Sequence, residues 1–164
     1  MRLKPTDKLD AAQLAEHLGA SIRPADELTS MANLEELEAL QPGAFSACTF
    51  DLGHHRVIVY NPISKPGRRQ SDISHEAAHL LLSHSVKEVE TLGGLSFLTC
   101  DPDEEQEANW LAGCLLLPRE LLLKAHYAGL DAEAIAARYE VSEQMATFRL
   151  RTTGVLRQGA HRAY

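Results

Sequence analysis

The feature that most constrains this chain is the stretch SDISHEAAHLLLSH, residues 71–84, where histidines and a glutamate interrupt the apolar pattern of a helix. On a helix, His75 and His79 project from one face about 40° apart, with Cβ atoms roughly 5–6 Å from each other. Glu76 lies on the same side, close enough to take a proton from a water held there. The HExxH spacing therefore predicts two imidazoles that share one metal ion beside a general base.

The same stretch also fits a helix whose histidines only pack or face solvent, so other residues must support the metal interpretation. A catalytic zinc site generally needs a third protein ligand and an open position. His84 is nine residues after His75 and would project from the opposite side of the helix, so we assign it no metal role.

A third ligand is expected on the acidic segment that follows, about thirty residues beyond the first histidine. The run 104–107 offers three glutamates at the start of a predicted helix. Glu107 shares a helical face with Leu111 and Cys114 that should turn towards the core, whereas Glu105 falls on a different face. Because a buried carboxylate is costly unless it binds a cation or is paired, Glu107 is the predicted third ligand. The interpretation requires this carboxylate to converge with the two imidazoles.

Periodicity and turn residues predict the remaining elements. Two β-rich runs joined by a turn indicate an antiparallel hairpin, and the segment with two prolines and a glycine after it indicates a loop. Helices separated by such a hairpin predict an α+β fold, mainly helical, with a small sheet that contains antiparallel strands. The predicted segments are helices at 9–18, 33–40 (capped by Asn33), 71–84 (capped by Ser71 or Asp72), 102–117 and 119–127, the hairpin at 44–50 and 56–60, and the loop at 61–70.

Composition limits the class of protein. The chain has 164 residues, of which 45% are hydrophobic, enough for a folded core. Its three cysteines form no CxxC pair, so neither a disulfide framework nor a cysteine zinc knuckle is expected. The N-terminus lacks the apolar run of a signal peptide, and no stretch has the roughly 18 apolar residues of a membrane span. These features predict a soluble cytoplasmic protein.

Charge is distributed unevenly. The net charge of −7 argues against the whole surface binding nucleic acid. Residues 138–164, however, carry five arginines against two glutamates. This basic tail is therefore expected to have a separate role.

Two linked signatures resemble the ImmA/IrrE family of metallopeptidases. Its members pair HExxH with a downstream E-A-N-x-[F/W]-A-x-x-L-L-x-P pattern, as ISHEAAHLLL and EQEANWLAGCLLLP do here. The resemblance implies a zincin-like, gluzincin-type site in which His75, His79 and Glu107 hold Zn²⁺, or Mn²⁺ instead, and Glu76 is the general base. It further implies site-specific cleavage of helix-turn-helix repressors that control mobile elements or DNA-damage genes.

The end of the chain is similar to the helix-turn-helix-like segment appended to this family. Residues 131–150 predict two short helices around a turn at Glu140, which stands where a glycine is usual, with Ser142 capping the second. Contact with DNA would use Arg149 and Arg151 on phosphates, but an acidic residue opens the second helix, so packing on the body or docking of substrate is favoured.

These inferences together divide the chain into a metallopeptidase domain, residues 1–128, and a helix-turn-helix-like segment, residues 129–164. The predicted partner is a protein substrate, without a membrane. The alternative is a non-catalytic regulator that uses the zincin-like body as a scaffold and binds DNA or a partner. An intact Glu76 favours the enzyme, because a binding protein needs no carboxylate beside two imidazoles.

Overall fold

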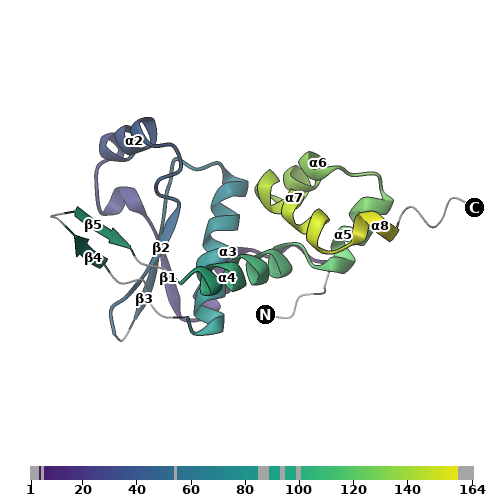
Figure 1. The fold of residues 1–164 in the computed structure, drawn as a ribbon, viewed down its shortest axis with the longest axis horizontal. Helices are drawn as coiled ribbons and strands as arrows, with labels where there is room; N and C mark the ends of the chain where they lie inside the picture. The colour runs from purple at the N-terminus through teal and green to yellow at the C-terminus, as the bar shows by residue number, and fades with distance from the viewer. Residues whose placement is uncertain are drawn as a thin grey trace, which may run out of the picture.

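The structure is a computed structural model that describes residues 4, 6–53, 55–84, 89–92, 95–98 and 101–158, with the side chains of 89–98 and of Gln158 left out. A small sheet lies on one side of two central helices, and a group of helices lies on the other (Figure 1). No described helix combines the length and the apolar character that a bilayer span requires. The elements are α1 (Ala11–His17), β1 (Ala20–Pro24), the 3-10 turn η1 (Ala25–Glu27), α2 (Met31–Leu40), β2 (Ala47–Asp51), β3 (Arg56–Tyr60), α3 (Pro66–Leu82), β4 (Val89–Leu92), β5 (Leu95–Leu98), α4 (Pro102–Leu116), α5 (Arg119–Tyr127), α6 (Ala132–Tyr139), α7 (Glu143–Thr152) and α8 (Val155–Gln158).

The three-stranded sheet has the order β1-β3-β2, so β3 is central. The predicted hairpin is confirmed, because β2 and β3 pair antiparallel with Thr49 opposite Ile58. The side chain of Asp51 accepts a hydrogen bond from the Gly53 amide, which holds the turn between these strands. Strand β1 adds to β3 in parallel and makes the sheet mixed. A separate hairpin is formed by β4 and β5.

Helix α3 begins earlier than the sequence indicated. It starts at Pro66, inside the predicted loop, so Ser71 and Asp72 are buried in its interior and do not cap it. Proline is favoured at the first helical position, where its missing N–H costs no hydrogen bond. Gly67, which lies in the predicted loop, is on the surface of the helix against Val141, where a side chain would not fit.

Helix α3 is the centre of the packing. One of its faces contributes Ile73 and Ala77 to a cluster with α1 and the sheet. The adjacent face carries Ala78, which packs against Ala108 and Ala112 of α4. Small residues on both helices allow the two to approach closely. The HExxH segment is therefore held between the sheet and α4.

The C-terminal helices pack around Leu122, Ile135 and Val155, which are fully buried, in a core that also includes Leu9 and, from α4, Leu116. Helix α5 belongs to this core, so it packs with the segment that follows residue 128. The division of the chain into a domain at 1–128 and a segment at 129–164 remains a prediction. Helices α6 and α7 flank the predicted turn, where Glu140 adopts the left-handed conformation with φ 50° and pairs with Lys8. The Ser142 side chain caps α7 as predicted.

Arg149 does not have the position that a DNA contact would need. Only 3% of it is exposed, and its Nε donates to the Leu117 carbonyl at 3.2 Å. Burial lowers the pKa of its guanidinium. Gly113 leaves room for its side chain. Arg149 therefore joins α7 to the end of α4, whereas Arg151 is exposed.

Candidate metal centre

Helix α3 brings the two predicted histidine ligands together. Their Nε2 atoms are 3.0 Å apart, and the side chains of His75 and His79 are 17% and 12% exposed. The rings meet at 79°, with centroids 4.6 Å apart. Both Nε2 atoms belong to partly exposed side chains and can therefore bind the same small cation.

The carboxylate that joins them belongs to Glu105. Its oxygens lie 3.2 Å from His75 Nε2 and 3.5 Å from His79 Nε2. One ligand atom from each of the three residues lies within 4.8 Å of the others. Glu107, the predicted third ligand, is not one of these three residues: its side chain is 67% exposed and lies against His84. The requirement for a converging carboxylate is met two residues earlier in the chain.

The position of Glu105 beside the histidines has a physical cause in the packing of α4. The predicted inward face of this helix was the stripe through Leu111 and Cys114. The face that actually meets α3 is the one with Ala108 and Ala112, both fully buried. Glu105 precedes Ala108 by three residues and so extends this face to the histidines. The alanine repeat was the signal that could have identified it.

Glu76 turns from the same helix towards the sheet. It is only 3% exposed, and its Oε2 accepts a 2.7 Å hydrogen bond from the Thr49 hydroxyl on β2. A carboxylate buried this far costs free energy unless donors or a nearby cation compensate. Thr49 supplies one donor, and a cation held by the adjacent histidines would supply the rest. Thr49 was not identified from the sequence.

His84 lies against His79 although it follows the end of α3. Ser83 adopts the left-handed conformation with φ 57°, and the His84 amide donates to the His79 carbonyl at 3.1 Å. This is the Schellman pattern, which reverses the chain over the last helical turn. The His84 ring therefore meets His79, with Nδ1 atoms 2.9 Å apart. The sequence reading assumed that the helix continued, which would have carried His84 away.

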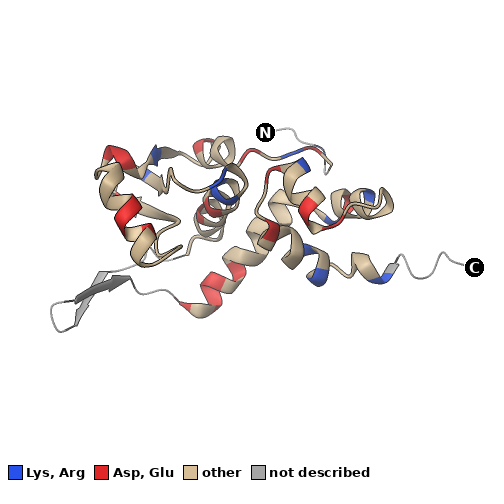
Figure 2. Ribbon diagram, turned by 90° about the horizontal axis from the view of Figure 1, so that it is seen from above, with Lys and Arg blue, Asp and Glu red and all other residues tan. Residues whose placement is uncertain are grey.

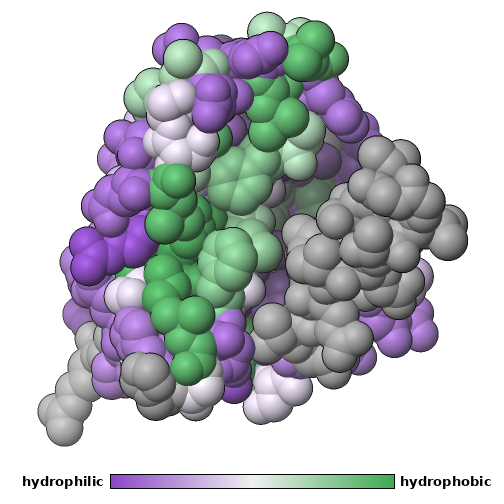
Figure 3. Space-filling model, turned by 90° about the vertical axis from the view of Figure 1, so that its left-hand side faces the viewer, coloured by the Kyte–Doolittle hydropathy of each residue, from purple (hydrophilic) through white to green (hydrophobic). Residues whose placement is uncertain are grey.

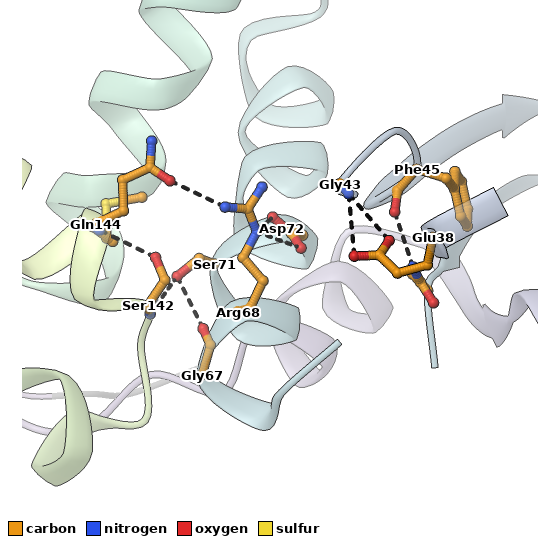
Figure 4. A network of polar contacts seen from close by, with 11 residues as sticks. Glu38, Gly43, Phe45, Gly67, Arg68, Ser71, Asp72, Ser142 and Gln144 are labelled. Carbon is orange, nitrogen blue, oxygen red and sulfur yellow. Dashed lines mark hydrogen bonds and ion pairs between the residues drawn. The ribbon is translucent and has the colours of Figure 1, made fainter. Parts of the chain in front are cut away.

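A polar network holds the first half of α3 to α7 (Figure 4). The Ser71 hydroxyl accepts a hydrogen bond from the Ser142 amide, and Arg68 bridges Asp72 and Gln144. Burial raises the pKa of Asp72, and the Arg68 guanidinium opposes that rise. Asp72 is thus engaged with Arg68, while Asn109 is exposed and lines the groove beside the cluster.

A groove of about 950 Å³ opens beside the cluster. His75 and Glu105 lie at its wall, together with residues of α4 and α7. Trp110 of α4 and Phe148 of α7 both line it and meet edge to face, with ring centroids 5.9 Å apart. The C-terminal segment thus forms part of the surface next to the candidate metal centre.

The three clustered residues fit a divalent cation such as Zn²⁺, because two imidazoles and a carboxylate are a donor set that this ion accepts. An HExxH helix between a small sheet and a helix that carries a third carboxylate defines an α+β fold of the metallopeptidase type. A family model described as the IrrE N-terminal-like domain, peptidase family M78, matches residues 38–151. The chain belongs to this family. The comparisons with curated proteins and with solved structures found no match.

Proposed function

We propose that the protein is a metal-dependent endopeptidase that hydrolyses a peptide bond in a protein substrate. The observation that carries the proposal is the convergence of His75, His79 and Glu105 beside the buried carboxylate of Glu76. Family membership supports a peptidase, and the intact HExxH residues support an active one.

A Zn²⁺ ion, or Mn²⁺, held by the three clustered residues would polarise the scissile carbonyl and lower the pKa of a bound water towards about 7. Glu76 would accept a proton from such a water and return it to the leaving amine. The Thr49 hydroxyl holds the Glu76 carboxylate in one orientation, because it donates to Oε2. The sheet therefore positions the base, and α4 completes the ligand set.

The surroundings of the site support an extended protein segment as substrate. Among the described residues, β2 is an edge strand, and an extended peptide can pair with such an edge. Apolar side chains also gather in a band on the face that carries α2 (Figure 3). The exposed apolar residues along the segment from η1 to β2 include Leu28, Leu40 and Phe50, at 69%, 78% and 46%. Exposed apolar patches of this kind mark contacts with other proteins.

We further infer that the substrate is a helix-turn-helix repressor, on the resemblance to ImmA/IrrE peptidases. The charges at the site are compatible with a substrate that carries basic residues, because acidic residues gather at the N-terminal end of α4 (Figure 2). Proteins that bind DNA carry such residues in clusters.

The test compares metal content and peptide cleavage in the wild type, Glu76→Gln and His79→Ala. A proteome-derived library of denatured peptides, read by mass spectrometry, serves as the probe. We expect roughly one ion per chain in the wild type and in Glu76→Gln, loss of the ion in His79→Ala, and cleavage by the wild type alone. Wild-type protein without metal, or cleavage that survives Glu76→Gln, would overturn the proposal. Stoichiometric metal without any cleavage would favour the non-catalytic regulator.

A further inference from the structure

His84 and Glu107 form a chain of contacts behind one of the clustered histidines. The Nδ1 atom of His84 lies 2.9 Å from Nδ1 of His79, and its Nε2 lies 3.3 Å from Oε2 of Glu107. The His84 side chain is 6% exposed, so its ring is held in place, whereas Glu107 is at the surface. Neither residue belongs to the cluster of three ligand atoms.

Hydrogen-bond chemistry allows only one arrangement of protons that leaves His79 able to bind a cation. A cation at Nε2 of His79 takes the lone pair of that nitrogen, so the ring proton must sit on Nδ1. Nδ1 then donates to Nδ1 of His84, which must accept. The proton of neutral His84 is thereby placed on Nε2, which faces the carboxylate of Glu107. His79 thus donates to His84, and His84 donates to Glu107.

We propose that His84 is a positioning residue for His79, and that Glu107 holds His84 in the tautomer that accepts from it; this inference rests on the proposed function. The carboxylate that the sequence suggested as a ligand thus acts on His79 through two contacts. Partners of this kind orient ligating histidines, and their removal typically weakens metal affinity about 10–100-fold.

His84 and Glu107 are expected to contribute unequally to metal affinity. The His84 side chain is only 6% exposed, so its hydrogen bond to His79 is shielded from water, and its removal takes this acceptor away from the Nδ1 proton of His79. Glu107 is largely exposed, and exposed pairs of this type contribute little free energy. We therefore expect a larger effect on metal affinity from His84 than from Glu107.

Main-chain hydrogen bonds at the end of α3 fix the position of His84. The Schellman pattern at Ser83 places the His84 ring through main-chain hydrogen bonds to His79 and Leu80, independently of the His84 side chain. A substitution at His84 therefore removes the contact to His79 without removing the helix end. This makes the pair suitable for a test by side-chain replacement.

The experiment measures the dissociation constant of Zn²⁺ by chelator competition for the full chain and four variants. His84→Ala removes the acceptor, and we expect affinity to fall about 10–100-fold. His84→Asn keeps an oxygen that can accept from His79, so it should recover most of the loss. Glu107→Ala should weaken binding less than His84→Ala does, and Glu107→Gln, which keeps an acceptor, should bind nearly as the wild type.

A second readout separates positioning from a structural role. The visible absorption of the Co²⁺-loaded protein reports the ligand field, and we expect it to change in His84→Ala and to return towards the wild type in His84→Asn. The thermal midpoint of the metal-free protein should be similar in both variants. Wild-type affinity in His84→Ala, or a loss that His84→Asn does not rescue, would overturn the inference while leaving the peptidase intact. A wild type that binds no metal would overturn both.

Discussion

Gly67 lies so close to Val141 that a Cβ atom at position 67 would be 2.8 Å from the Val141 carbonyl carbon. This contact joins the first turn of α3 to the turn between α6 and α7. The nearby hydrogen bond from the Ser142 amide to Ser71 lies on the same junction. At Gly67 the helix that carries the histidines thus packs directly against the backbone of the C-terminal segment, with no space for a larger residue.

Gly67→Ala is therefore expected to destabilise the protein, although alanine is the better helix former. Overpacking costs roughly 1–3 kcal/mol, and the gain in helix propensity offsets about 1 kcal/mol of it. Urea unfolding measures the difference, with Glu36→Ala on the exposed side of α2 as a control expected to change little. An unfolding free energy above that of the wild type would show that the α3 junction is looser than described.

Glu105→Gln and Glu107→Gln discriminate between the two candidate carboxylates. Glu105 lies with both imidazoles, so its replacement by a neutral amide should abolish stoichiometric Zn²⁺ binding. Glu107→Gln should retain the ion, because Glu107 does not reach the cluster. Metal analysis after dialysis checks both, and the reverse pattern would restore Glu107 as the ligand.

Glu140→Gly is expected to stabilise the protein by about 0.5–1 kcal/mol. A side chain in the left-handed region costs roughly 1–2 kcal/mol, and glycine removes that cost. The ion pair with Lys8 that is lost is exposed and contributes about 0–1 kcal/mol. Glu140→Ala is the matched control, since it loses the ion pair and keeps the strain. Thermal unfolding should place glycine above the wild type and alanine below it.

Asp51 makes the stability of the β2–β3 turn depend on pH. The hydrogen bond from the Gly53 amide and that from Arg56 lower the pKa of its carboxyl below the usual range. A lowered folded-state pKa stabilises the protein above the ordinary aspartate range, and this contribution is lost as the pH falls through the folded-state value. Asp51→Asn should therefore have a lower free energy of unfolding than the wild type at pH 7, and this gap between the two proteins should shrink at acid pH. Urea titrations at both pH values measure this gap, and a constant gap would contradict the assignment.

Local sequence signals determined much of this fold. The hairpin follows from β-branched and aromatic runs around a turn, and α5 begins after Pro118 and ends at Tyr127 as the pattern predicted. The Ser142 cap and the pairing of His75 with His79 depend only on residues within one or two turns of each other. Such features could be predicted because the interactions that produce them join neighbours in the chain.

Other features were decided by contacts between distant segments. The choice of Glu105 over Glu107 depends on which face of α4 meets α3, and the close approach of Ala78, Ala108 and Ala112 selected the face with the smaller side chains. Ser83 adopts the left-handed conformation, which glycine usually provides at a helix end, and this conformation decided where His84 lies. The sequence by itself therefore determined a helix with two imidazoles and a base. Only tertiary packing decided which carboxylate meets them, because a helix has several faces and its neighbours select the one that is buried.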